Sequence, residues 1–273
     1  MKTMNGIHPK KSLGQNFLKD QSVIERILAA AEVVPGDKIF EIGPGTGVLT
    51  EALAKRGGQV LAIELDHELV ERLNKHFEES AGVSILEGSI LGVNLAATLA
   101  HASYPLHGYK VVANIPYYIT APIIRTLLSL ERQPQSLTLM VQKEVAERLT
   151  AKPGAMSLLS LMAQYYSDAA LAFVVPKEAF DPVPKVDSAV VRLVPKRRFD
   201  AETDRQFFRL ARAGFAARRK TLSNNLSSSL KIEKNEIEAA FVALGLRADI
   251  RAQSLSVLDW QRLQETLSPE RLT

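Results

Sequence analysis

The stretch KIFEIGPGTGVLTEALAKR, residues 38–56, decides the fold of this chain. The apolar segment Lys38–Ile42 has the composition of a buried strand, and it runs into a glycine-rich turn followed by the helix-like segment Leu49–Arg56. Glycine lets a backbone turn tightly and approach a ligand closely. A helix that begins at such a turn favours anionic groups at its N-terminus. The stretch therefore predicts a strand–loop–helix unit with a ligand at the loop.

Strand-like and helix-like segments alternate through the first two thirds of the chain. The expected strands are Lys38–Ile42, Gln59–Ile63, Val83–Leu86, Lys110–Ala113, Leu137–Val141, Leu171–Val175 and Ala189–Val194. The expected helices are Gln21–Ala31, Leu49–Arg56, His67–Glu79, Ala121–Leu130, Lys143–Thr150 and Ser157–Tyr166. This alternation predicts an α/β fold with a parallel sheet covered on both faces. A Pro-rich loop separates the last two strands, so we expect them to pair antiparallel at one edge.

The composition changes after Pro195, where KRRFDAETD (residues 196–204) has the character of a linker. No convincing strand follows it. The later segments with helical character are Asp204–Ala217, Thr221–Leu230, Lys234–Leu244 and Val257–Leu267. We therefore expect two domains, residues 1–198 and a small all-α domain of residues 199–273.

The spacing of the glycines narrows the class of ligand. A dinucleotide fingerprint has the spacing G-x-G-x-x-G, whereas this loop has Gly43, Gly45 and Gly47, with Val48 in place of a later glycine. The absence of a hydride-transfer constellation further disfavours a nucleotide-dependent dehydrogenase. Glu64, at the end of the second strand, can accept both hydroxyls of a ribose or simply cap the following helix. The neighbouring Leu65 and the pair Ser89 and Ile90, after the third strand, are candidate contacts to an adenine.

The run NIPYY, Asn114–Tyr118, follows another expected strand. The amino group of adenine is a poor nucleophile because its lone pair is delocalised into the ring. The Asn114 side-chain oxygen and a carbonyl just before or at Pro116 can accept its two hydrogens, and the Tyr117 ring can stack on the base. An ordinary strand-ending turn is the alternative, since Asn and Pro are common in turns. Combined with the glycine loop and Glu64, NIPYY favours transfer of a methyl group from S-adenosylmethionine to an unpaired or flipped adenine.

Composition excludes several other classes. The 273 residues contain no cysteine, so disulfides, thiolate metal sites and a cysteine nucleophile are excluded, and the 5 histidines show no metal-binding spacing. We therefore expect no metal. The N-terminal segment lacks the apolar core of a secretory signal, and no run of 18 apolar residues is present. A cytoplasmic protein without a membrane span is the expectation.

The net positive charge is small, but the basic residues are clustered in two stretches of the sequence. The formal net charge is only +4, but residues 1–19 carry four lysines and no acid, and residues 196–220 carry nine basic residues against three acids. Such clusters favour contacts with nucleic-acid phosphates, although a solvated helix face is the alternative. The candidate RNA-binding residues are Lys10, Lys11, Arg218, Arg219 and Lys220.

Five segments together resemble the bacterial small-subunit (16S) ribosomal RNA adenine dimethyltransferases. They are KKSLGQNFL (10–18), EIGPGTG (41–47), NIPYYIT (114–120), FDPVPKVDS (180–188) and FAARRKTLSNNL (215–226). The resemblance covers almost the whole chain. It implies a Rossmann-like, seven-stranded class I methyltransferase sheet with a small helical domain that binds RNA. It also implies that the protein dimethylates two adjacent adenosines during ribosome biogenesis.

The resemblance also implies roles for particular residues. Gln15, Asn16 and Leu18 would lie against the methionine part of the cofactor, and Phe180 would face Tyr117 across the target base. Ser89 stands where the family usually has Asp, so a neutral hydroxyl replaces a carboxylate near the adenine of the cofactor. Neutral hydrogen bonds contribute about 0.5–1.5 kcal/mol and charged ones about 1.5–3 kcal/mol, so this exchange is expected to weaken cofactor binding.

Two alternatives share most of these motifs. A large-subunit rRNA adenine methyltransferase of the macrolide-resistance type has the same cofactor and base-binding motifs, but RRKTLSNNL (218–226) favours the small-subunit enzyme. A non-catalytic RNA-binding assembly factor on the same fold is disfavoured by the intact pair Asn114 and Tyr117. The expected partner is the small ribosomal subunit, and a monomer is the default expectation.

Overall fold

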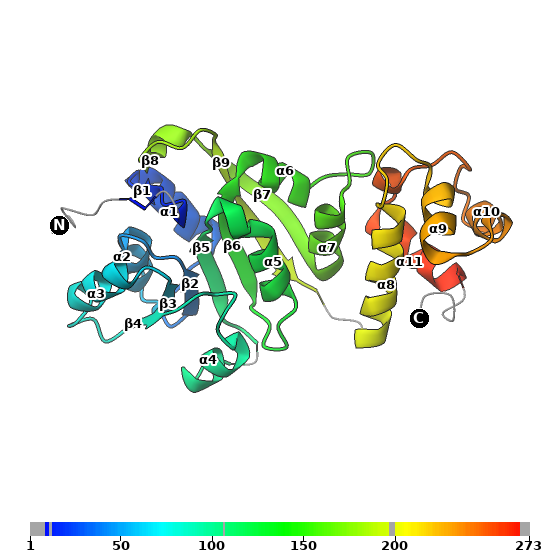
Figure 1. The fold of residues 1–273 in the computed structure, drawn as a ribbon. Helices are drawn as coiled ribbons and strands as arrows, with labels where there is room; N and C mark the ends of the chain where they lie inside the picture. Colours follow the sequence, from blue (N-terminus) through cyan, green and yellow to red (C-terminus); the bar gives the residue numbers. More distant parts are fainter. Residues whose placement is uncertain (1–8, 11–12, 106, 197–199, 268–273) are drawn as a thin grey trace. The chain divides into compact units, whose positions relative to one another are not determined.

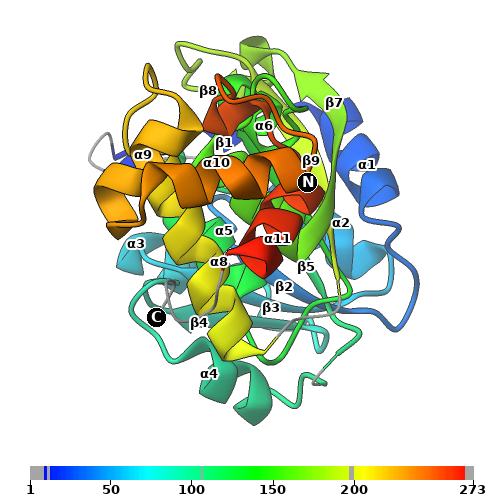
Figure 2. The same cartoon turned by 90° about the vertical axis from the view of Figure 1, so that its right-hand side faces the viewer.

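The computed structural model describes residues 9–10, 13–105, 107–196 and 200–267. The chain forms two compact units (Figures 1 and 2). Unit 1 comprises Met1–Ala146 and Ser167–Pro195, and unit 2 comprises Glu147–Tyr166 and Lys196–Thr273. Compared with domains of residues 1–198 and 199–273, the main difference is that Glu147–Tyr166 groups with the C-terminal helices.

Unit 1 is built on a sheet whose strand order, over the described residues, is β4-β3-β2-β5-β6-β9-β7. Strands β4, β3, β2, β5 and β6 are parallel, and β9 lies antiparallel between β6 and β7. The strands are β2 (Lys38–Ile42), β3 (Gln59–Glu64), β4 (Val83–Glu87), β5 (Lys110–Asn114), β6 (Ser136–Gln142), β7 (Ser167–Val175) and β9 (Ser188–Pro195). The predicted α/β sheet and its antiparallel edge pair are confirmed.

Helices cover both faces of this sheet (Figure 1). Ile39, Val60 and Val112 share one face and pack in a cluster with residues of α1 and α2. Phe40 and Val111, which point to the opposite face, are also fully buried. The helices are α1 (Gln21–Ala30), α2 (Val48–Lys55), α3 (His67–His76), α4 (Leu95–His101), α5 (Thr120–Leu128) and α6 (Lys143–Leu149). Burial on both sides explains why these strands are continuous apolar runs.

A second, two-stranded sheet joins distant parts of unit 1. Strand β1 (Phe17–Leu18) pairs antiparallel with β8 (Phe180–Asp181). A short 3₁₀ turn, η3 (Lys177–Ala179), precedes β8, and the Ala179 carbonyl accepts a hydrogen bond from the Lys19 amide at 2.9 Å. The N-terminal segment is therefore held against the Pro-rich loop.

Unit 2 is helical in its described residues and has its own core. Its helices are α7 (Leu158–Tyr166), α8 (Ala201–Gly214), α9 (Leu222–Leu230), α10 (Lys234–Ala243) and α11 (Val257–Thr266), with a 3₁₀ turn, η4 (Ala252–Ser254). Trp260, Phe207 and Phe241 are buried at its centre. Tyr165 of α7 stacks on Phe207 with ring centroids 4.0 Å apart. This aromatic packing explains why α7 belongs with the C-terminal helices.

The turn between α8 and α9 is tightly held. The Asn225 side chain donates to the carbonyls of Gly214 (2.7 Å) and Ala217 (3.0 Å). A Cβ on Gly214 would lie 2.3 Å from Cη2 of Trp260, so only glycine fits there without a shift of the indole ring. The motif FAARRKTLSNNL therefore contains residues that shape this turn as well as exposed basic residues.

None of the described helices has the length and apolar composition needed to cross a membrane.

Candidate active site

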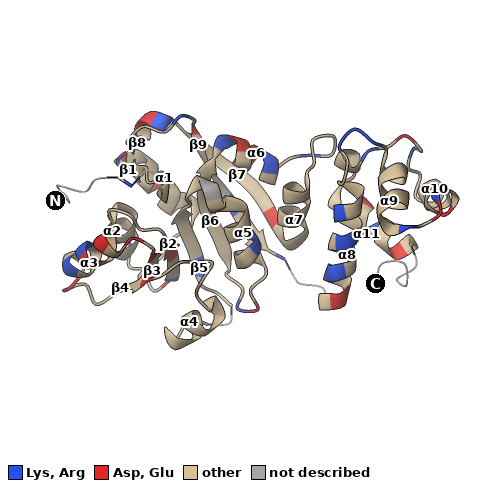
Figure 3. Cartoon of the chain, viewed as in Figure 1, with Lys and Arg blue, Asp and Glu red and all other residues tan. Residues whose placement is uncertain are grey.

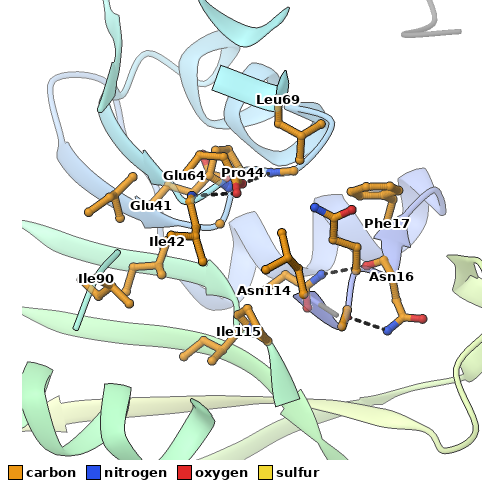
Figure 4. A pocket seen from close by; sticks show the side chains of 18 of the residues that line it. Asn16, Phe17, Glu41, Ile42, Pro44, Glu64, Leu69, Ile90, Asn114 and Ile115 are labelled. Carbon is orange, nitrogen blue, oxygen red and sulfur yellow. Dashed lines mark hydrogen bonds between the residues drawn. The ribbon is translucent and has the colours of Figure 1, made fainter. Parts of the chain in front are cut away.

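A cleft opens in unit 1 where β2, β3, β4 and β5 end (Figure 4). Its empty volume is about 1060 Å³, including the part open to solvent. The sequence-predicted residues that line it are Gln15, Asn16, Leu18, Gly43, Gly45, Glu64, Leu65, Ser89, Ile90, Asn114, Pro116 and Tyr117. The structure thus brings the predicted cofactor residues together with the NIPYY motif.

The glycine loop forms one wall of the cleft. Gly45 has φ +59°, and a Cβ there would approach the Phe17 ring to 3.1 Å. Gly47 has φ +79° and is the N-cap of α2, so it takes a left-handed conformation that disfavours a side chain. The loop therefore leaves its backbone open to the cleft, at the N-terminus of a helix.

Glu64 lies at the end of β3 and is 7% exposed. Its Oε1 accepts hydrogen bonds from the amides of Leu65 (2.8 Å) and Asp66 (2.9 Å), and its Oε2 accepts one from Gly45 at 3.2 Å. Burial raises the pKa of Glu64, and the three backbone donors partly oppose that rise. The carboxylate is thus fixed in orientation, and Oε2 retains an acceptor position for a ligand hydroxyl.

Glu41 is a residue of the cleft that the sequence interpretation missed. It lies one residue before the end of β2, is 1% exposed and lines the cleft. Burial raises its pKa to about 8, the neighbouring Thr50 hydroxyl opposes part of that rise, and the nearby Glu64 carboxylate adds to it. Its Oε2 has no hydrogen-bond partner among the described residues. An acid inside the apolar strand KIFEI was the available signal.

Asn114 ends β5 and is half-buried at the cleft. Its side-chain nitrogen donates to the Asn16 carbonyl at 3.4 Å, which directs its side-chain oxygen elsewhere. The Pro116 carbonyl already accepts from the Ile119 amide and the Thr120 hydroxyl, both at 3.3 Å. Of the two carbonyls considered from the sequence, the one at Ile115 is therefore better available to a ligand.

Tyr117 begins the 3₁₀ turn η2 (Tyr117–Ile119) and lines the same cleft. Its hydroxyl lies 2.7 Å from Oγ of Ser188, and either atom can be the donor. Burial raises the pKa of Tyr117, so the hydroxyl stays protonated at neutral pH.

Residues 13–18 of the N-terminal segment form another wall of the cleft. Gln15 of this segment and the earlier Lys10 both bind Asp66, which lies two residues after Glu64. Lys10 Nζ is 2.5 Å from Asp66 Oδ1, and Gln15 Nε2 is 2.9 Å from Asp66 Oδ2. Burial raises the pKa of Asp66, but the Lys10 and Gln15 hydrogen bonds and the Lys10 charge more than offset it, so the net shift is downward. Lys10 and Gln15 thus tie the N-terminal wall of the cleft to Asp66, and Lys10 together with residues 13–18 is called the strap from here on.

The remaining predicted residues lie elsewhere. The Phe180 ring is fully buried in the core cluster that contains Leu18, and it does not line the cleft, so its role against the target base stays a prediction. Arg218, Arg219 and Lys220 are exposed residues of unit 2. Lys11 lies outside the described residues. Among the described residues, no group of three or more His, Cys, Asp or Glu side chains is arranged to hold a metal.

Comparison with known proteins identifies the family. The model of the family described as ribosomal RNA adenine dimethylase matches residues 7–268. The chain belongs to this family. The prediction of an rRNA adenine dimethyltransferase is confirmed by this match.

Two proteins with similar sequences carry the name of a small-subunit methyltransferase. Ribosomal RNA small subunit methyltransferase A of Dehalococcoides mccartyi (strain ATCC BAA-2266 / KCTC 15142 / 195) is 42% identical over 259 residues, which cover 94% of this chain and 88% of the relative. The protein of the same name from Geobacillus kaustophilus is 42% identical over 272 residues, covering 97% and 92%. These relatives favour the small-subunit prediction over the large-subunit alternative.

Solved structures confirm the fold class. The 23S rRNA methyltransferase ErmE superposes with a TM-score of 0.74 at 27% identity, covering 92% of this chain and 99% of that structure. A dimethyladenosine transferase from Plasmodium falciparum gives a TM-score of 0.73 at 25% identity, covering 90% and 95%. The fold is that of a class I methyltransferase, and fold and family together support the use of S-adenosylmethionine.

We predict a pH-dependent effect of Glu41→Gln on stability. An ordinary glutamate titrates near 4.5, whereas Glu41 titrates near 8 in the folded chain. Between these values the folded chain holds a proton that the unfolded chain releases, so stability falls as pH rises through this window and levels off above it. The Gln variant lacks this loss. Its melting temperature relative to wild type should therefore rise across the window.

Melting curves at several pH values, with the exposed Glu144→Gln as matched control, measure this effect. A difference between Glu41→Gln and wild type that stays constant from about pH 5 to pH 9 would contradict the assignment.

We also predict that Lys10→Ala weakens cofactor binding. Removal of the Lys10 charge frees the strap from Asp66, so the dissociation constant for S-adenosylmethionine should rise about two- to fivefold, the effect of a partly exposed ion pair. Lys19→Ala removes the same charge from the end of the same segment without touching Asp66, and it should leave the constant unchanged. Calorimetric titration distinguishes the two, and equal effects of both variants would argue against the strap.

Proposed function

We propose that this chain transfers methyl groups from S-adenosylmethionine to the exocyclic amino nitrogen of adenines in 16S rRNA of the small ribosomal subunit, dimethylating two adjacent adenosines. One observation carries this proposal. Asn114 and the Ile115 carbonyl lie at the end of β5, in the same cleft as the glycine loop and Glu64. The names of the sequence relatives support the choice of subunit.

The residues of the cleft fit S-adenosylmethionine. Glu64 retains an acceptor position for a ribose hydroxyl, Ile90 offers a buried apolar wall, and the Gly45 backbone is bare. Leu65, which is 48% exposed at the rim, can cover the adenine of the cofactor, and Ser89 can hydrogen-bond to it. Gln15, Asn16 and Leu18 form the opposite wall, where the methionine part would lie.

The main requirement of the reaction is that the protein orients the adenine amino group toward the methyl group. When bound, S-adenosylmethionine supplies an electrophilic methyl group. Asn114 Oδ1 and the Ile115 carbonyl accept the two amino hydrogens of adenine, which localises the nitrogen lone pair and points it along the line of transfer. Tyr117 stacks on the base. No strong base is needed, because the methylated nitrogen is acidic and water can take its proton. Positioning and fixed dipoles therefore account for the rate.

The second methylation places one demand on the same residues. A monomethylated amino group has one hydrogen fewer, so one of the two acceptors loses its partner. The half-buried position of Asn114 leaves its oxygen within reach of water, which makes this loss tolerable.

A burial constraint bears on the predicted role of Phe180. Its ring is enclosed in the core of unit 1, next to the β1–β8 pair. In the proposed mechanism the ring reaches the target base only after leaving this position, whereas Tyr117 already lines the cleft.

Unit 2 supplies the proposed contacts to RNA phosphates. Lys and Arg residues occur along α8 and in the turn that joins α8 to α9 (Figure 3). Arg218, Arg219 and Lys220 are exposed on that turn, which Asn225 fixes in shape. Lys10 is proposed as a strap residue because its ammonium is already paired with Asp66. Ribosomal RNA as substrate also supports a cytoplasmic enzyme, and we propose that it acts as a monomer.

The test of the proposed function uses small subunits that lack the modification, incubated with the protein and labelled cofactor, followed by mapping of the modified bases. Label in adenines of 16S rRNA is the expected result. Label confined to large subunits, or no label at all, would overturn the proposal.

We predict that Asn114→Ala separates chemistry from cofactor binding. Loss of a fixed hydrogen-bond acceptor at the reacting group should lower kcat about 100-fold or more. Affinity for S-adenosylmethionine, measured by calorimetry, should change only a few-fold. Asn74→Ala, at an exposed position in α3 of unit 1, is the matched control and should behave as wild type. Near wild-type turnover by Asn114→Ala would disprove its assigned role.

We predict a different signature for the triple variant in which Arg218, Arg219 and Lys220 become Ala. Each lost phosphate contact should reduce the slope of log affinity against log salt by about 0.7–0.9. The KM for small subunits should therefore rise most at low salt, while kcat at saturation is retained. The exposed Arg262→Ala is the control. A fall in kcat with an unchanged KM would place these residues in a different role.

A further inference from the structure

Two segments far apart in the sequence meet in a single side-chain hydrogen bond. Tyr117 belongs to NIPYY, and Ser188 is the last residue of FDPVPKVDS. The Tyr117 hydroxyl and the Ser188 hydroxyl are 2.7 Å apart. Since Tyr117 lines the cleft and Ser188 does not, this bond ties a residue of the site to a part of the sheet behind it.

Ser188 occupies a rigid place in unit 1. It is the first residue of β9, is fully buried, and pairs with Gln142 of β6 and Val175 of β7. The preceding residue, Asp187, is held as well. Its carbonyl accepts from the Lys143 amide at 3.0 Å, and its Oδ1 accepts from the Lys177 amide at 3.1 Å. A hydroxyl in this position can shift little.

Tyr117, by contrast, is the first residue of a short 3₁₀ turn and is only half-buried. An aromatic ring at such a position can rotate about its side-chain bonds unless its far end is held. The Ser188 hydroxyl holds that end, and thereby restricts the plane of the ring. Stacking requires the ring plane to be parallel to the base, so this restriction bears directly on base binding.

We propose that Ser188 is a positioning residue that sets the plane of the Tyr117 ring for stacking on the target adenine. The proposal rests on the function proposed above. In this proposal Ser188 links the segment FDPVPKVDS to base binding by orienting Tyr117, and the Phe180 ring of the same segment is not required.

A second serine in the same sheet argues against a purely structural reading. Ser136 is the first residue of β6, is 1% exposed, and has an Oγ without a hydrogen-bond partner among the described residues. The sheet therefore tolerates a buried serine that makes no such bond. In β9, Ser188 is followed by the fully buried Ala189, Val190 and Val191. The Ser188 hydroxyl is thus the polar group at the start of an apolar run, and its partner is the hydroxyl of the Tyr117 side chain.

The experiment is a double-mutant cycle with Ser188→Ala and Tyr117→Phe, in which Ser136→Ala serves as the matched control. Each of the first two variants removes one partner of the bond, and Tyr117→Phe keeps the ring. KM and kcat are measured on undermethylated small subunits, with the affinity for S-adenosylmethionine and the melting temperature measured alongside.

We expect each single variant to raise KM or lower kcat/KM about two- to tenfold, as expected for one neutral hydrogen bond. The double variant should lose no more than either single one, because both remove the same interaction. Affinity for the cofactor should stay within twofold of wild type, and Ser136→Ala should match wild type in KM. Lowered melting temperatures with both KM and kcat/KM unchanged, or additive losses in the double variant, would overturn the proposal.

A second measurement avoids chemistry altogether. A short uridine-rich RNA with a single 2-aminopurine is titrated into the protein without cofactor, and quenching of the probe reports stacking. Wild type and Ser136→Ala should quench it equally, and Ser188→Ala and Tyr117→Phe less. Equal quenching by all four proteins would contradict the role of Ser188. If wild type methylates small subunits and these variants match it, the positioning role fails alone. If wild type leaves small subunits unmethylated, the proposed function fails first.

Discussion

The backbone ladder between the parallel strands of unit 1 is the constraint on which the site depends. Ile42 of β2 pairs with both Ile63 of β3 and Ala113 of β5. The next residue in each strand is therefore carried to the same edge at the same level: Gly43, Glu64 and Asn114. A shift of β5 by one residue would turn Asn114 to the other face and remove it from the cleft. The cofactor and base contacts share one edge because the two registers, β2 with β3 and β2 with β5, agree.

Much of this edge was predictable because it is encoded in local sequence. Apolar runs that alternate with helical segments define parallel strands, and the ends of such strands meet at one edge. Gly43, Glu64 and Asn114 each follow such a run directly, so their meeting follows from the strand assignments. The antiparallel β9 also followed from local signals, since its Pro-rich connection has no crossover helix.

Features formed by contacts between distant segments could not be predicted in this way. Strand β1 has two residues, too few to show a period of two, and its partner β8 begins 162 residues after β1 ends (Leu18 to Phe180). The basic neighbours of Lys10 in the sequence predict a phosphate contact, but they give no sign of its ion pair with Asp66. Phe180 stands on a Pro-rich loop in the sequence, which does not show that its ring is buried beside the β1–β8 pair. The place of α7 in unit 2 depends on the stacking of Tyr165 on Phe207.

The walls of the cleft differ in how firmly they are held, and the difference has a physical cause. Gly43, Glu64 and Asn114 stand at the ends of strands that are hydrogen-bonded on both sides and buried on both faces. The strap, Lys10 with residues 13–18, is held by a two-residue ladder, by the Gln15–Asp66 hydrogen bond and by an ion pair whose lysine side chain is 42% exposed. Such contacts open at a lower free energy than a sheet does. The strap can therefore release from the cleft while the groups that orient adenine keep their positions, so entry and exit of ligands need not disturb the geometry of transfer.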